Sequence, residues 1–390
     1  MREDWEIKKL GEICESVSNI NWKKISVDTK FPYIDLSAVD RDNSKICEYE
    51  CINKDNAPSR AKQIVNTGDV IFATTRPLLK RVCVITKPFN HAIASTGFCV
   101  LRPTGKVVSK WIYYKLKSDS FYKYIKPLQK GISYPAVTDN EVKNFTIPVP
   151  PLSEQEHIVE ELDLLSGVIE KKREQLKELD NLAQSIFYDM FGDPITNEKD
   201  WEVKKLGEVF QISSGGTPNT KNPEFWDNGT YSWIGSNMCQ NEILYHNDGK
   251  YITETGLNNS SAKEYSKGFV LVALVGATIG KVGLLKFNTT TNQNIAGIDV
   301  PSNKQYTPEF VFYLMQNLYD LFLQIGGDKF KMANLSFVRD LPIITPPLPL
   351  QQEFAEKIEA IEKQKELIKQ SLNDVQTLFN SRMDYYFSEE

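Results

Sequence analysis

The chain has 390 residues, 41% hydrophobic and 25% charged, which excludes wholesale disorder and a collagen-like repeat and allows two or three domains. Neither an apolar run behind the N-terminus nor a membrane-length apolar stretch is present, and six cysteines and three histidines are too few for a disulfide framework or a histidine-rich metal site. We therefore expect a reduced, cytoplasmic protein with no metal and no membrane contact. The net charge of −5 argues against nucleic acid only if it is evenly spread.

The sequence contains an internal duplication. Residues 4–13 (DWEIKKLGEI) recur as residues 200–209 (DWEVKKLGEV), 196 positions later. Pro150-Pro151-Leu152 recurs as Pro346-Pro347-Leu348 at the same offset, while the regions between these anchors diverge. The repeat predicts a two-copy duplication with globular segments at 1–150 and 194–348 and helical segments at 151–193 and 349–390.

Each globular segment has a mixed pattern. Short strand-like runs at 70–72, 82–85, 269–273 and 295–298 are separated by Gly, Pro, Asn and Thr. One helix is expected from Ser109, and another from Thr307, which supplies a cap before Pro308. The pattern indicates the α+β class.

Each segment is followed by a helix of about 35 residues, hence roughly 50 Å long. Apolar residues alternate at spacings of three and four, which is typical of a coiled-coil seam. The expected seam consists of Ile158, Leu162, Leu165, Ile169, Leu176, Leu179, Ile186, Phe354, Ile358, Ile361, Ile368, Leu372, Val375 and Phe379. Packing of each helix against its own domain is the alternative, and we favour mutual pairing because the two seams share one register.

The charge is unevenly spread along the chain. Residues 1–150 carry a net charge of +8, 151–193 carry −7, 194–348 carry −2 and 349–390 carry −4. The first globular segment is therefore basic enough for phosphate contact, whereas the second would depend on uncharged donors or on a partner.

Taken together, these features resemble the DNA-specificity subunit of type I restriction-modification systems. The resemblance rests on the duplicated starts at 5–12 and 201–208, the Pro-Pro-Leu-x-x-Gln entries ending at Gln155 and Gln351, Phe-Gly-Asp-Pro at 191–194, and Ser-Gly-Gly-Thr-Pro at 214–218 with Trp233-Ile234. It implies two pseudo-symmetric mixed α/β target-recognition domains separated by two long antiparallel coiled-coil helices.

The resemblance also implies a function. Each domain would read one half of a bipartite, asymmetric target in double-stranded DNA, and the chain itself would be non-catalytic. Its partners would be two copies of the modification methyltransferase subunit and, through that complex, the restriction translocase. S-adenosylmethionine, Mg and ATP would be bound by those partners, so this chain would hold no cofactor.

Candidate DNA-contacting residues combine cations, amides, hydroxyls and aromatics in loops. In the first half they are Asn21, Lys23, Lys24, Thr75, Arg76, Lys80, Arg81, Lys130, Ser133 and Tyr134. In the second half they are Ser214, Thr217, Asn219, Lys281, Asn292, Gln293, Lys329, Phe330 and Lys331. Solvated loops and surface turns would also explain these residue types.

Two short strings resemble motifs of enzyme classes that we do not expect here. Residues 276–281 resemble a phosphate loop but are one residue short and lack the Ser or Thr after Lys281, so nucleotide binding is not expected. A carboxylate-containing string at 139–143 resembles a nuclease motif, but the same Glu-x-Lys pattern recurs at 6–8 and 202–204 by chance. The remaining alternative is a coiled-coil scaffold whose two variable domains bind proteins.

Overall fold

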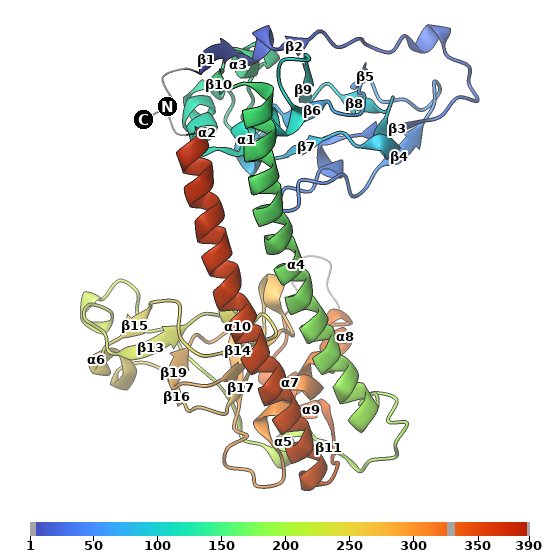
Figure 1. The fold of residues 1–390 in the computed structure, drawn as a ribbon. Coiled ribbons are helices and arrows are strands. Elements are labelled where there is room, and N and C mark those ends of the chain that lie inside the picture. The colour runs from blue at the N-terminus through green and yellow to red at the C-terminus, as the bar shows by residue number, and fades with distance from the viewer. Residues whose placement is uncertain (1–4, 326–331, 388–390) are drawn as a thin grey trace. The chain divides into compact units, whose positions relative to one another are not determined.

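The computed structural model describes residues 5–325 and 332–387. It divides into two compact units, residues 1–173 with 370–390 and residues 174–369. Each unit therefore contains one globular domain and a part of each long helix (Figure 1).

The first unit contains two sheets and a strand pair. The first sheet has the order β2 (Cys14–Glu15), β9 (Phe98–Pro103), β6 (Val70–Ala73), β7 (Val82–Val84). The second has the order β4 (Glu50–Ile52), β3 (Phe31–Ile34), β8 (Ile93–Ser95), β5 (Ala61–Ile64), and β1 (Glu6–Lys9) pairs antiparallel with β10 (Thr146–Val149). The helices are α1 (Ser109–Lys117), α2 (Asp119–Ile125) and α3 (Asp139–Lys143), with short 3-10 turns η1 (Leu10–Glu12), η2 (Trp22–Lys24), η3 (Leu36–Ala38), η4 (Pro77–Leu79), η5 (Lys87–Phe89) and η6 (Lys126–Leu128).

The second unit repeats this plan. Its first sheet has the order β12 (Ile212–Ser214), β20 (Ile295–Ile298), β17 (Val270–Ala273), β18 (Val282–Leu285), β14 (Glu242–Leu244). The second has the order β15 (Tyr251–Ile252), β13 (Tyr231–Ile234), β19 (Thr289–Thr291), β16 (Glu264–Tyr265), and β11 (Val203–Lys205) pairs with β21 (Pro342–Ile344). Its helices are α5 (Leu206–Val209), α6 (Glu254–Asn258), α7 (Pro308–Asn317), α8 (Tyr319–Leu323) and α9 (Leu335–Asp340), with 3-10 turns η7 (Pro223–Phe225), η8 (Ser236–Met238) and η9 (Gly276–Thr278).

The strand orders show the duplication directly. Element by element, β2-β9-β6-β7 corresponds to β12-β20-β17-β18, and β4-β3-β8-β5 corresponds to β15-β13-β19-β16. The second domain adds β14 at the edge of its first sheet, parallel to β18. The expected strands and helices are present, and Thr307 caps α7 by accepting the Phe310 N–H at 3.3 Å. The predicted α+β architecture is confirmed.

The two long helices are α4 (Leu152–Phe191) and α10 (Leu348–Phe387), each of 40 residues rather than the expected 35. Helix α4 ends before Gly192, whose φ of +76° lies in the left-handed region that glycine adopts without steric cost. All fourteen residues of the expected seam are buried or half-buried in the described chain.

Within each unit the two helices run antiparallel. In the first unit, Glu161 of α4 accepts the Tyr386 hydroxyl at 2.6 Å and lies 2.8 Å from Arg382 of α10. In the second unit, the rings of Phe187 and Phe354 meet at 5.7 Å. Mutual pairing is therefore present. Packing of each helix on its own domain is also present at the helix starts, where Ile158 of α4 and Phe354 of α10 are buried, whereas the far ends pack elsewhere.

Those helix ends are parts of the domain cores. Met383 and Phe387 of α10 are buried in the core of the first domain together with Trp111 and Phe121. Ala183, Phe187 and Phe191 of α4 are buried in the core of the second domain, in a cluster that includes Phe310. The core of the first domain is thus completed by the C-terminal end of α10, the helix that follows the second domain. The core of the second domain is completed by the C-terminal end of α4, the helix that follows the first domain.

One polar residue occupies the seam of the second unit. The Lys365 ammonium lies 2.8 Å from Asp180 and 2.7 Å from Glu362, and only 13% of its side chain is exposed. Burial alone would lower the pKa of Lys365, but the two carboxylates more than offset it and the pKa is raised. A buried charge pair of this kind favours one register of the paired helices over slipped alternatives.

The entry of each long helix is locked by a buried glutamine. The Gln155 amide accepts from the Val108 N–H at 3.0 Å and donates to the carbonyls of Lys106 and Pro150. The Gln351 amide accepts from the Thr307 N–H at 3.0 Å and donates to the carbonyls of Gln305 and Pro346. The Pro-Pro-Leu-x-x-Gln motif therefore forms the joint, meaning the hydrogen-bonded connection between each long helix and the domain before it. The sequence repeat identifies the motif but does not predict this role.

Candidate nucleic-acid interface

The turn between β6 and β7 presents basic residues on an unusual backbone. Arg76 and Lys80 have φ angles of +50° and +56°, with the 3-10 turn η4 between them. Both side chains are exposed, while Pro77 is buried and anchors the turn. A non-glycine residue with positive φ is uncommon, and such strain gathers at functional sites.

A second loop, at residues 130–136, packs against this turn. Lys130 and Ala136 exchange two backbone hydrogen bonds of 2.9 Å, which close the loop, and Val137 N–H donates to the Thr74 carbonyl at 2.9 Å. Gly131 at the start of the loop has a φ of +97°. We call residues 75–80 and 130–136 the first loop pair.

Arg76 joins the two loops. Its backbone N–H donates to the Pro135 carbonyl at 2.6 Å, and its guanidinium donates to the Ser133 carbonyl at 3.4 Å. The guanidinium carbon lies 4.5 Å from the centre of the Tyr134 ring, in cation–π geometry. The structure therefore brings together Thr75, Arg76, Lys130, Ser133 and Tyr134, which are up to 59 residues apart in the sequence.

Lys80 and Arg81 are placed differently from each other. The Lys80 ammonium lies 4.5 Å from the centre of the Tyr122 ring, and its side chain is exposed. Arg81 is half-buried and donates to the Leu36 carbonyl at 2.9 Å. Part of its hydrogen-bonding capacity is thus used inside the domain.

The candidates Asn21, Lys23 and Lys24 lie on the second sheet of the domain. Asn21 accepts the Lys23 N–H at 3.1 Å and caps η2. Trp22 anchors the segment by donating to the Ala61 carbonyl of β5 at 2.9 Å. The three polar side chains are exposed, but they are held by a sheet other than the one that carries the first loop pair.

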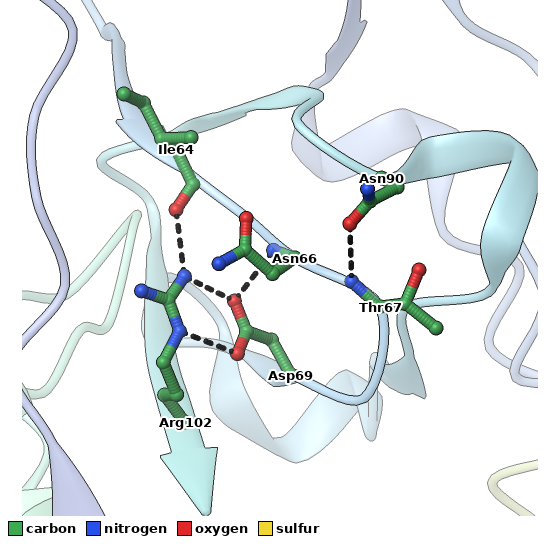
Figure 2. Close-up of polar contacts among 6 residues, drawn as sticks. All are labelled: Ile64, Asn66, Thr67, Asp69, Asn90 and Arg102. Atoms are coloured by element: carbon green, nitrogen blue, oxygen red, sulfur yellow. Dashed lines mark hydrogen bonds and ion pairs between the residues drawn. The ribbon is translucent and has the colours of Figure 1, made fainter.

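A buried ion pair fixes the turn that leads into β6. Figure 2 shows Arg102 of β9 donating to both carboxylate oxygens of Asp69, at 2.9 and 2.8 Å, and to the Ile64 carbonyl. Asp69 also accepts the Asn66 N–H, and its hydrogen bonds with Arg102 raise the pKa of that guanidinium. The pair holds the end of β5 to the start of β6 and the end of β9, at the opposite end of β6 from the first loop pair. No local pattern in the sequence predicts this pair, because its partners lie 33 residues apart.

In the second domain, two predicted segments meet. Gly216 N–H donates to the Thr291 carbonyl at 2.8 Å, and the Thr217 hydroxyl donates to the Gln293 amide oxygen at 2.7 Å. A Cβ on Gly215 would lie 2.2 Å from the Thr291 hydroxyl, so only glycine fits this approach. We call residues 213–219 and 291–294 the second loop pair.

The remaining candidates of the second loop pair support its shape. Ser214 is half-buried on β12, and the Asn219 carbonyl accepts the Trp226 indole N–H at 3.2 Å. Asn292 accepts the Asn294 N–H at 3.0 Å through its side chain. Gln293 and Asn219 are the exposed members.

The segment that resembles a phosphate loop is the turn between β17 and β18. Gly276 and Gly280 have φ angles of +74° and +76°, and Lys281 donates to the Gln240 side chain at 2.8 Å. Lys329, Phe330 and Lys331 lie outside the described residues. Ala333 N–H donates to the Leu274 carbonyl at 2.9 Å, as Val137 does to Thr74 in the first domain.

Residues 5–325 and 332–387 contain neither a metal-ligand cluster nor a membrane-spanning helix. Within that part of the chain, no group of three or more His, Cys, Asp or Glu side chains is arranged to hold a metal ion. No helix in the same residues combines the length and apolarity needed to cross a membrane.

Comparison with known proteins identifies the family. A family model described as the type I restriction modification DNA specificity domain matches the chain twice, over residues 2–181 and 198–377. The type I restriction enzyme MjaIX specificity subunit of Methanocaldococcus jannaschii is 24% identical, with 90% of this chain and 85% of that protein covered. The HindI specificity subunit of Haemophilus influenzae is 21% identical, with 92% and 93% covered.

Comparison with solved structures gives the same family. A structure from a study of complex assembly and conformational transition of the type I R-M system matches with a TM-score of 0.60 at 25% identity, covering 100% of this chain and 99% of that one. The type I restriction-modification S subunit from M. genitalium has the same fold, with a TM-score of 0.59 at 13% identity and coverage of 99% and 97%. The chain belongs to the DNA-specificity family of type I restriction-modification systems, whose members are non-catalytic DNA-recognition subunits.

Proposed function

We propose that this subunit reads a bipartite, asymmetric sequence in double-stranded DNA, one half-site for each domain. The observation that carries the proposal is the convergence of sequence-distant polar candidates into one loop pair on each domain. The first loop pair offers Arg76 and Lys130, whereas the second offers Thr217 and Gln293. Arginine suits the guanine edge and glutamine the adenine edge in the major groove, so the two half-sites should differ.

Phosphate contacts would position the domains. In this proposal Lys80, Lys23, Lys24 and Lys281 contact the DNA backbone, and Arg81 contributes through the part of its guanidinium that Leu36 does not occupy. Ser214, Asn219 and Asn292 shape or contact the second half-site, and Lys329, Phe330 and Lys331 remain predictions outside the described residues. The net charge of +8 on residues 1–150 supports electrostatic attraction of the first domain.

The partners belong to the same proposal. The duplicated chain, with two copies of one joint at Gln155 and Gln351, suits binding of two copies of the methyltransferase subunit. That complex would recruit the restriction translocase in the cytoplasm. S-adenosylmethionine, Mg and ATP would be bound by the partner subunits, and methylation would require the target adenine to be flipped out.

The test is methylome sequencing of a host that expresses this chain with its methyltransferase subunit. We expect one bipartite asymmetric motif, with Arg76→Ala relaxing one half of it and Gln293→Ala relaxing only the other half. Each variant is the control for the other, because both are exposed loop residues of the same subunit. If the reconstituted complex shows no sequence preference, the proposal is wrong and a protein-binding scaffold is favoured.

A further inference from the structure

One side chain of the first loop pair is exposed in a way that DNA reading through polar contacts does not explain. Ile132 has a relative exposure of 102%, so it touches almost nothing beyond its own backbone. Two other apolar side chains of the same loop pair are also exposed, Leu78 at 43% and Tyr134 at 68%. Single exposed apolar residues are common, so exposure alone decides nothing.

The backbone around Ile132 is held in place. The reciprocal hydrogen bonds of Lys130 and Ala136 close the loop, and Arg76 ties it to the neighbouring turn through Pro135, Ser133 and the Tyr134 ring. Four of these contacts involve backbone atoms, so the position of the tip does not depend on Ile132 itself. The apolar side chain is therefore displayed by a preorganised loop.

Charges flank this tip. The Arg76 guanidinium contacts the ring of Tyr134, two residues after Ile132, and the 81% exposed Lys130 side chain begins two residues before it. The nearby acid Glu141 lies 3.5 Å from Lys130, but its carboxylate also accepts the Thr138 N–H and hydroxyl. A loop that carries an apolar tip, with one cation two residues before the tip and another stacked on the ring two residues after it, matches a partner with phosphates outside and stacked apolar faces inside.

We propose that Ile132 is a wedge that inserts between two stacked base pairs of the first half-site and bends the duplex there. The proposal rests on the DNA-reading function proposed above. Apolar wedges flanked by basic residues partly unstack one base step and kink DNA by this means. At the matching position of the repeat the sequence has Asp328, so the wedge belongs to the first domain and the bend is one-sided.

The test uses the complex with its methyltransferase and duplexes that carry the motif found by methylome sequencing. Duplexes carry 2-aminopurine at successive positions of the first half-site other than the target adenine, and a second set carries a donor–acceptor dye pair at the two ends. S-adenosylmethionine is left out so that flipping of the target base does not dominate the signal. Wild-type complex should raise 2-aminopurine fluorescence at one step and shorten the end-to-end distance.

Ile132→Ala should abolish the fluorescence rise, reduce the bend and weaken binding of the matched duplex about tenfold. Ile132→Met should retain most of both signals, because an apolar side chain of similar length still fills the step. Ile195→Ala is the matched control, since Ile195 is another exposed isoleucine, outside both loop pairs. That control should behave as wild type.

The outcomes separate the two proposals. If wild-type complex shows sequence preference and Ile132→Ala bends and binds DNA equally well, the wedge is wrong and the proposed function stands. If Ile132→Ala instead fails to assemble with the methyltransferase in the absence of DNA, the tip docks protein and the wedge is also wrong. If wild-type complex shows no sequence preference, the proposed function fails and the wedge fails with it.

Discussion

Equivalent turns of the two domains share their backbone conformation and hydrogen bonds but differ in the chemistry of their side chains. The turn into β6 and the turn into β17 share four backbone or Asn-mediated hydrogen bonds, such as Thr67 N–H and Lys267 N–H donating to Asn90 and Asn288. Glycine occupies the same place in both, Gly68 at φ +91° and Gly268 at φ +96°. At the next residue the first domain has Asp69, paired with Arg102, whereas the second has Phe269, packed on Tyr265 at 5.2 Å.

The turns that follow β6 and β17 differ in the same way. Arg76 and Lys80 have the positive φ angles that Gly276 and Gly280 have in the other domain. The duplication has therefore kept backbone conformation and hydrogen bonding while side chains changed from ionic to apolar and from basic to glycine. This difference is what allows two readers of one fold to prefer different half-sites.

The largest predicted effect comes from breaking the ion pair that only the first domain has. Asp69→Ala should lower the free energy of unfolding of the first unit by about 3–5 kcal/mol, because it leaves Arg102 partly buried without its partner. Hydrogen exchange resolved by segment, alongside chemical denaturation, would locate the loss in residues 61–73 and 98–103. Adding Arg102→Ala should recover part of the loss, and a double variant no better than the single one would contradict the role given to the pair.

The next largest predicted effect is a loss of stability that should be equal in the two domains. Gln155→Met and Gln351→Met keep most of the side-chain volume but remove the buried hydrogen bonds at the helix joints. Each should destabilise its own unit by about 2 kcal/mol, because backbone groups are left unsatisfied. The losses in free energy of unfolding, measured by thermal unfolding of the two variants, should agree within about 1 kcal/mol, the usual scatter of such losses. A large difference between them would show that the joints are not equivalent.

The smallest effect sharpens the comparison of the turns. Arg76→Gly removes the contact with Tyr134 but relieves the positive φ, so the two contributions should nearly cancel. Arg76→Ala loses the contact and keeps the strain, so it should be less stable than Arg76→Gly by about 1 kcal/mol. This order reverses the usual ranking of alanine and glycine. Matched denaturation curves of the two variants would check it, and Gly276→Ala should lower stability by a similar amount.

Much of this fold could be predicted from the sequence because its signals are local or repeated. Strand runs such as 70–72 and the Thr307 cap depend on neighbours within a few residues. The 196-residue repeat added the domain plan. The joint formed by Gln155 could only be marked by the repeat, since its partners at Lys106 and Val108 depend on the tertiary fold.

Long-range pairs could not be predicted. Seam periodicity defines the apolar face of a helix but does not name the surface that covers it, so the packing of Phe387 in the first domain was not foreseen. The candidate loop residues were chosen by type, and the stacking of Arg76 on Tyr134 needed the tertiary structure. The DNA contacts themselves remain predictions.

The exchange of helix ends has a consequence for how the protein is made. Met383 and Phe387 complete the core of a domain that begins near residue 5. The buried Lys115 and the half-buried Ser120 of that domain donate hydrogen bonds to the Phe387 carbonyl. During synthesis part of the apolar surface of the first domain therefore stays uncovered until residues 383–387 have left the ribosome. The second domain receives its missing helix end, Phe191, before its own strands are made. The half of the gene that is translated first thus encodes the half of the protein that is finished last.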